Sequence, residues 1–355
     1  MQHRTIWVDM LRGFSMLAIL WFHTEMYYAG RDVTPYALYV GDVLAAFFFL
    51  SGYLFYRETP VSLRHKLYGV VRWLLVPYLV FTSLLALPKA WAHHSFQGFG
   101  NLAVDVLTGQ ASWFVSALIV AELFFILTLR FFKSSWGMAA LALVMLLAAA
   151  VFGNRLSAWY NNCNLWHVNE ALLGYFFMTL GYYFHRYEGV FAHRPRLLDG
   201  ESEPFGLGVR AVRTGSPHRS DCESEAFGLI VLALLFLLCK YLILSSHAQV
   251  VFGPIIVSNY PLFIADLIVS VLLLVGVFRR LPSISFLCWV GKRSIVYYFI
   301  CGGVPLVVGR LLVKMGLPYS CFIQLFLAFA VVLVVSTAIV WLVYRYTHIV
   351  RKPNG

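Results

Sequence analysis

Charged residues are scarce in this sequence. Asp, Glu, Lys and Arg make up 12% of its 355 residues, whereas 61% are hydrophobic and the mean hydropathy is +0.77. So few charges are unusual for a soluble globular protein. A low share of charged residues with a high share of hydrophobic ones is typical of a polytopic membrane protein. The composition therefore predicts an all-α integral membrane protein.

Cysteine is also rare, and its positions exclude several kinds of site. The six cysteines fall mostly in apolar runs or on the predicted inner side, so a disulfide framework is not expected. Cysteine and histidine show no zinc-ligand spacing, and no glycine-rich phosphate loop follows a strand pattern. We therefore expect no metal and no nucleotide-binding fold.

A cleavage site is missing after the first apolar run. Arg4 is the one firm positive charge before this run, no small-residue cleavage site precedes Gly30, and many apolar runs follow. A cleaved signal peptide would instead begin with a clearly basic segment and end at a cleavage site of small residues. The first run is therefore interpreted as a retained membrane span.

Apolar runs of about 20 residues, the length that crosses a bilayer, recur along the whole chain. They predict ten transmembrane helices, at residues 7–27, 37–56, 70–88, 112–132, 137–153, 165–185, 227–245, 261–279, 294–314 and 319–344.

The basic residues between these runs predict the orientation, because Lys and Arg accumulate in cytoplasmic loops. With the N-terminus in the cytoplasm, 20 of them fall on the inner side and 5 on the outer side. Ten crossings then place both termini in the cytoplasm. Cytoplasmic loops beside anionic membrane lipid thus explain the net charge of +11, and no basic groove for nucleic acid is visible.

One polar stretch interrupts the apolar pattern. Residues 194–226 contain five Arg and six acidic residues without a long apolar run, and such a stretch cannot bury enough surface to order itself. We interpret residues 1–355 as a single transmembrane domain with a flexible cytoplasmic loop insertion at 194–226. Surface loops tolerate insertions that have no catalytic consequence.

The first apolar run contains four ionisable residues, which are costly inside a bilayer: Asp9, Arg12, His23 and Glu25. Arg12 and His23 are 11 positions apart, so on an α-helix they lie within about 20° of one face and roughly 16 Å apart along the axis. Asp9 precedes Arg12 by three positions and can pair with it. Glu25 lies about 200° around the helix from His23, so it is not expected to orient the imidazole.

Two interpretations of this stripe are open. Arg12 and Asp9 can form an interfacial pair while His23 is a hydrogen-bonded core histidine. Alternatively, Arg12 offers the fixed fork of donors that suits phosphate, and a neutral His23 imidazole can take a proton from a hydroxyl as it attacks a thioester. The second interpretation predicts a phosphate-bearing donor that enters from the cytoplasm.

Six short segments with distinctive motifs follow one another along the chain. They are DMLRGFSMLAILWFH (9–23), FFFLSGYLFY (47–56), KLYGVVRWLLVPYLV (66–80), WFVSALIVAELFF (113–125), FFMTLGYYF (176–184) and WVGKRSIVYYFI (289–300). This series resembles the acyltransferase-3 family of integral-membrane acyltransferases, whose first span carries Arg, ten residues and His. The chain departs from the family pattern at Cys301, where many relatives have histidine, and in its insertion at 194–226.

The resemblance implies an O-acyltransferase that moves an acyl group, most often acetyl, from cytoplasmic acyl-CoA to a hydroxyl of an extracytoplasmic glycan or another envelope molecule. Acetyl-CoA is then the donor, and the bacterial inner membrane is the expected location. The implied roles are a general base or transient acyl carrier for His23, and a hold on the donor phosphates for Arg12 and Arg72. A periplasmic partner protein is compatible with this function.

Four further residues have a functional and a structural interpretation. Ser51 is expected near the donor, but Ser-Gly pairs also serve close helix packing. Trp113 can stack on a substrate or belong to the interfacial aromatic belt. His167 and Glu170, three positions apart, share a helix face and can bind the acceptor or pair with each other.

Transport is the rival function from another class. Ten spans with buried ionisable residues also describe a proton-coupled transporter or a glycan flippase. Such carriers more often show interrupted helices in two matching halves, and the interruption at 302–305 has no counterpart in the first half of the sequence. A membrane sensor of acetyl-CoA without turnover is a third alternative.

Overall fold

The structure, a computed structural model, describes residues 6–57, 62–92, 96–132, 134–159, 164–192 and 219–347. The described chain is almost entirely helical, with one antiparallel two-stranded hairpin, and the predicted all-α class is confirmed. The predicted loop at 194–226 lies mostly outside the described residues. Its last part, from Arg219 on, belongs to a long helix.

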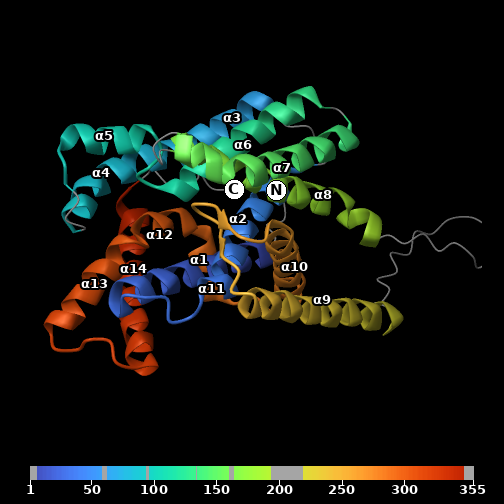
Figure 1. The fold of residues 1–355 in the computed structure, drawn as a ribbon. Coiled ribbons are helices and arrows are strands. Elements are labelled where there is room, and N and C mark those ends of the chain that lie inside the picture. Colours follow the sequence, from blue (N-terminus) through green and yellow to red (C-terminus); the bar gives the residue numbers. More distant parts are fainter. Residues whose placement is uncertain are drawn as a thin grey trace, which may run out of the picture.

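Figure 1 shows the order of the elements along the chain. They are α1 (Ile6–Thr24), the π-helical turn η1 (Glu25–Ala29), the short η2 (Tyr36–Leu38), α2 (Val40–Phe55), α3 (Leu63–Val70), the π-helical turn η3 (Val71–Leu75), α4 (Val76–Ala92), α5 (Phe99–Leu107), α6 (Trp113–Phe131), α7 (Ser135–Trp159), the short η4 (Leu165–His167), α8 (Val168–Ala192), α9 (Arg219–Ser245), β1 (Val250–Val251), β2 (Ile256–Val257), α10 (Tyr260–Phe278), α11 (Ser285–Lys292), α12 (Ser294–Ile300), α13 (Gly303–Lys314) and α14 (Phe322–Tyr346).

Membrane-spanning length is reached by several of these helices. Within the described residues, 7 helices are long and apolar enough to cross a bilayer, and up to 8 if α12 and α13, bent by 48°, form one span. The runs predicted at 37–56 and 165–185 correspond to α2, which has 16 residues, and to α8, which has 25. Neither is among the 7, so the count of ten crossings and the cytoplasmic location of both termini stay predictions.

Helix α2 forms the centre of the bundle, and nearly all of its residues are buried. It packs closely on α8 because glycines remove side chains at the contact. A Cβ atom at Gly52 would lie 1.8 Å from the backbone oxygen of Met178, and one at Gly181 would lie 1.9 Å from that of Phe49. The glycine that follows Ser51 therefore serves helix packing, as the structural interpretation of the Ser-Gly pair predicts.

A second close contact joins α1 to α11. A Cβ atom at Gly13 would lie 2.1 Å from the backbone oxygen of Leu287, and one at Gly291 would lie 1.9 Å from that of Asp9. Gly291 is the glycine of the Gly-Lys-x-Ser segment. Its lack of a side chain lets residues 291–294 approach the part of α1 that carries Arg12.

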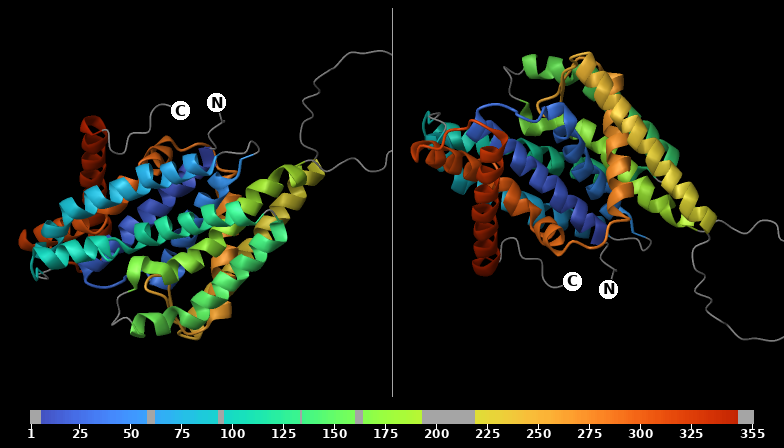
Figure 2. Two further views of the ribbon diagram at one scale, coloured as in Figure 1. Left: turned by 90° about the horizontal axis from the view of Figure 1, so that it is seen from above. Right: turned by 90° about the horizontal axis from the view of Figure 1, so that it is seen from below.

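The outermost helices lie on opposite sides of the bundle. Figure 2 shows α14 at one edge and α9 at the other, with α1 and α2 between them. Helix α14 packs against α1, α12 and α13. Helix α14 is thereby brought beside α1, although almost 300 residues lie between them in sequence.

Candidate active site

Helix α1 holds the two residues of the Arg-x10-His motif in one rigid element. It is α-helical from Ile6 to Thr24, without a break between Arg12 and His23. The two side chains therefore share a face, as predicted, and both are partly buried. Glu25 points elsewhere: its carboxylate accepts hydrogen bonds from the Thr34 backbone NH at 3.0 Å and the Tyr39 hydroxyl at 3.4 Å. Through these two hydrogen bonds Glu25 holds the loop that follows α1 in place.

Wide π-helical turns occur beside two of the predicted site residues. Turn η1 begins at Glu25, two residues after His23, and turn η3 contains Arg72. A π-helical turn inserts an extra residue into the helix and re-aims the side chains around it, and such turns are frequent at functional sites. Helical periodicity in the sequence did not reveal either turn.

His23 lies among polar groups from three segments. Its ring stacks on the Tyr27 ring with centroids 6.0 Å apart. Lys89 of α4, whose ammonium is exposed and donates to the Ala111 backbone oxygen at 3.2 Å, lies within electrostatic range of the imidazole. Cys301 lies near both Tyr27 and Lys89, and a Cβ atom at the adjacent Gly302 would lie 3.9 Å from the Tyr27 hydroxyl. Tyr27 and Lys89 were not expected from the sequence, because nothing in their spacing links them to the motif.

Cys301 lies at the break between α12 and α13. It is buried, and its thiol donates to the backbone oxygen of Tyr298 at 2.9 Å. The position at which many members of the resembled family carry histidine is therefore close to the surroundings of His23, through Tyr27 and Lys89.

The other end of the motif lies beside aromatic residues and a second arginine. Arg12 and Arg293 both interact electrostatically with Tyr344 of α14. The Arg293 guanidinium lies over the Trp289 ring at 4.4 Å and over the Tyr344 ring at 5.2 Å, and it donates to the Trp289 backbone oxygen at 3.3 Å. Sequence reasoning missed Arg293, which occupies the variable position of Gly-Lys-x-Ser. The adjacent Lys292 is exposed.

Arg72 and Ser51 have partners of their own. The Arg72 guanidinium lies over the ring of Trp73 at 5.0 Å, on a turn that packs against α3, α4 and α6. The Ser51 hydroxyl is buried and donates to the Glu122 carboxylate of α6. The structure thus pairs Ser51 with Glu122, a residue whose partner the sequence did not reveal. The expected roles of Arg72 and Ser51 toward the donor stay predictions.

The three residues expected to bind the acceptor lie together. The rings of Trp113 and His167 have centroids 6.2 Å apart, and His167 Nδ1 lies 3.5 Å from a carboxylate oxygen of Glu170. Glu170 also accepts a hydrogen bond from the Asn164 side chain. Trp113 packs closely on the hairpin, because a Cβ atom at Gly253 would lie 2.4 Å from its ring.

His167 has two features that are common at binding sites. Trp166 and His167 both have a φ of 51°, a left-handed conformation that costs about 1–3 kcal/mol for a residue other than glycine. Both ring nitrogens of His167 are buried, and within the described residues neither makes a hydrogen bond. Buried polar groups without partners are rare in folded proteins, which makes this imidazole a candidate group for binding a ligand.

Helix α12 connects the cluster of Trp113, His167 and Glu170 to the surroundings of His23. The Tyr298 hydroxyl accepts a hydrogen bond from the backbone NH of Phe114, the neighbour of Trp113, at 3.2 Å. Three residues further on, Cys301 and Gly302 lie near Tyr27. The predicted acceptor residues and the predicted base are therefore linked through one short helix.

Comparison with known proteins gives one match. The sequence model of a family described as an acyltransferase domain matches residues 5–345. Neither the curated proteins nor the solved structures provide a match. The matched range includes all of the site residues named above.

Proposed function

Because the chain belongs to the acyltransferase-3 family, it is a membrane acyltransferase, and we propose that it moves an acetyl group from cytoplasmic acetyl-CoA to a hydroxyl of an extracytoplasmic glycan or related envelope molecule. We place it in a bacterial inner membrane, where the donor is available on one side and the acceptor on the other. A periplasmic partner protein that presents the acceptor is compatible with this proposal.

The separation of two chemically different groups along α1 carries the proposal. Arg12, with Arg293 and Tyr344, lies at one end, whereas His23, with Tyr27 and Lys89, lies about 16 Å further along the helix. Guanidinium groups beside aromatic rings suit the phosphates and the adenine of a nucleotide-bearing donor. An imidazole stacked on a tyrosine and within electrostatic range of a lysine suits proton transfer and charge stabilisation.

In the proposed reaction His23 acts as a general base. Its neutral imidazole takes the proton of the acceptor hydroxyl while the oxygen attacks the thioester carbonyl. Lys89 stabilises the negative charge that develops on the carbonyl oxygen. The C–S bond then breaks, and the imidazolium returns the proton to the departing thiolate. Transient acylation of His23 is the alternative route, in which the hydroxyl attacks an acyl-imidazole.

The outer cluster is proposed to bind the acceptor. The His167 imidazole, oriented by Glu170, would exchange hydrogen bonds with acceptor hydroxyls, and Trp113 would contact the apolar face of a sugar ring. Holding two large substrates in one orientation supplies much of the rate acceleration in reactions of this kind.

One observation favours the transport alternative. Helices α12 and α13 meet at an angle of 48° at Cys301 and Gly302, and interrupted helices of this kind line substrate paths in carriers. A proton-coupled transporter or a glycan flippase would use Arg12 and His23 as parts of a translocation path, without breaking a thioester.

Thioester chemistry separates the two functions. Detergent-purified protein is incubated with radiolabelled acetyl-CoA and no acceptor, and binding and slow hydrolysis are measured for the wild type, Arg12→Ala and His23→Ala. We expect weaker binding in Arg12→Ala and loss of hydrolysis in His23→Ala. Phe14→Leu, on the outward face of the same helix, is the control and should behave as the wild type. A well-folded wild type that does not bind acetyl-CoA would instead support transport.

A further inference from the structure

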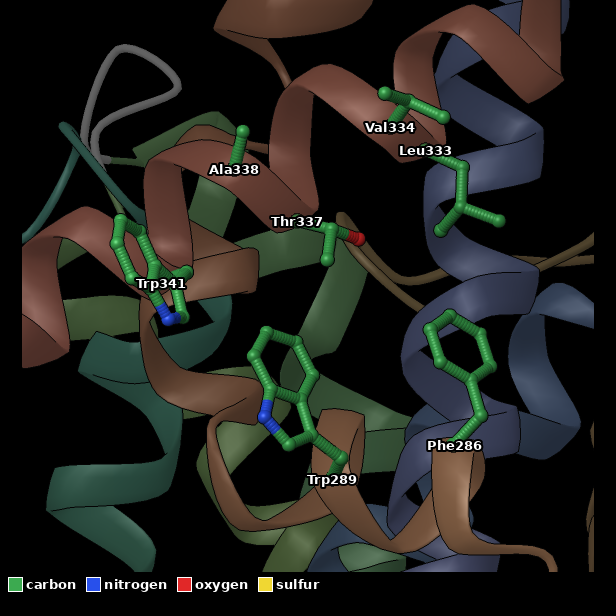
Figure 3. A pocket seen from close by; sticks show the side chains of 7 residues that line it. All are labelled: Phe286, Trp289, Leu333, Val334, Thr337, Ala338 and Trp341. Atoms are coloured by element: carbon green, nitrogen blue, oxygen red, sulfur yellow. The ribbon is translucent and has the colours of Figure 1, made fainter.

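A groove runs between α11 and α14 on the side of the bundle, away from α9. Its volume is about 440 Å³, and Figure 3 shows the side chains that line it. They are Phe286 and Trp289 from α11, and Leu333, Val334, Thr337, Ala338 and Trp341 from α14.

The walls of the groove fit an apolar chain. Val334, Trp341 and Phe286 are 68%, 49% and 43% exposed, so three large apolar side chains lie open at the surface of the groove. The one hydroxyl in the lining, that of Thr337, is already hydrogen-bonded to the Tyr297 hydroxyl at 2.7 Å. The groove therefore presents no unsatisfied side-chain hydroxyl that would require a polar ligand.

Two arginine side chains form cation–π contacts with the tryptophans of the groove. The Arg293 guanidinium lies 4.4 Å from the ring of Trp289, and that of Arg345 lies 5.1 Å from the ring of Trp341. Arg345 is exposed and follows Trp341 by one helical turn. Basic residues beside a groove between membrane helices are suited to the phosphate of an anionic lipid.

We propose that this groove is a binding site for one anionic phospholipid. An acyl chain lies along Phe286, Val334 and Ala338, and the phosphate lies beside the exposed Arg345. A zwitterionic lipid would satisfy the apolar wall equally well but would gain less from the positive charge of Arg345. The proposal does not depend on the chemistry at His23, since a transporter with the same groove would bind the same lipid.

Native mass spectrometry of protein reconstituted with equal amounts of phosphatidylglycerol and phosphatidylcholine tests the proposal. Ala338→Trp fills the groove, and Arg345→Gln removes the exposed cation. Ala140→Trp and Arg310→Gln are matched controls, because both residues are exposed on other helices. Thermal unfolding of each variant in the same detergent shows whether it is folded.

We expect the wild type to retain one phosphatidylglycerol molecule in preference to phosphatidylcholine. Ala338→Trp should abolish this bound lipid, and Arg345→Gln should weaken it about fivefold, the equivalent of about 1 kcal/mol for one basic residue near a membrane surface. Both controls should bind as the wild type. Unchanged retention in folded Ala338→Trp, equal retention of the two lipids by the wild type, or unchanged selectivity in Arg345→Gln would each overturn the proposal.

Discussion

The ammonium group of Lys240 lies 2.8 Å from a carboxylate oxygen of Asp266 in the interior of the bundle. The same ammonium lies 2.8 Å from Asp42 and donates to the backbone oxygen of Ala37 at 2.9 Å. All three charged side chains are buried. This cluster ties α9 to α2 and α10, so the outermost helix on that side is held by ionic contacts as well as by apolar packing.

Replacing Lys240 alone should be strongly destabilising. Lys240→Met leaves two carboxylates buried without their cation, and breaking a buried ion cluster in this way costs about 3–5 kcal/mol. Replacing all three residues together, as Lys240→Met with Asp42→Leu and Asp266→Leu, should recover most of that loss, because no charge is left buried. Thermal unfolding in detergent measures both. A single variant as stable as the wild type would contradict the assigned role.

Gly52→Ala should disrupt the contact between α2 and α8. The added methyl group would overlap the Met178 carbonyl, which is backbone and cannot move aside, so a loss of about 1–3 kcal/mol or more is expected. Gly69→Ala is the control: among the described residues, no atom beyond the neighbouring turns of its own helix lies within 4 Å of a Cβ at that position, and alanine favours the helix. Folded yield and unfolding temperature should fall for the first variant only.

Arg293→Gln should weaken the binding of acetyl-CoA. If Arg293 shares the donor phosphates with Arg12, losing its charged hydrogen bonds would cost about 1.5–3 kcal/mol, or roughly 10- to 150-fold in Kd. Lys292→Gln removes an exposed charge at the adjacent position and should change Kd little. Equilibrium binding of radiolabelled acetyl-CoA compares the two. Equal affinities would remove Arg293 from the donor site.

Cys301→Ser should retain thioester hydrolysis. The thiol donates to the Tyr298 backbone oxygen, and a serine hydroxyl can make the same contact, whereas His23 supplies the proposed base. We expect a rate within about threefold of the wild type, corresponding to less than about 1 kcal/mol. A loss comparable to that of His23→Ala would instead make Cys301 part of the chemistry.

The sequence by itself determined the features that depend on local pattern. Runs of apolar residues predicted the all-α membrane class, and helical periodicity placed Arg12 and His23 on one face, because both rules involve residues within a single helix. The order of six short motifs identified the family. None of these inferences required knowledge of which helices touch.

Tertiary structure alone decided which groups meet. Arg12 and Arg293 come near Tyr344, Lys89 comes near His23, and Ser51 donates a hydrogen bond to Glu122 only because helices distant in sequence pack together. The π-helical turns beside His23 and Arg72 likewise break the periodicity on which sequence reasoning depends. Contacts between helices are set by the shapes of their packed surfaces, and a single sequence does not show how those surfaces pair.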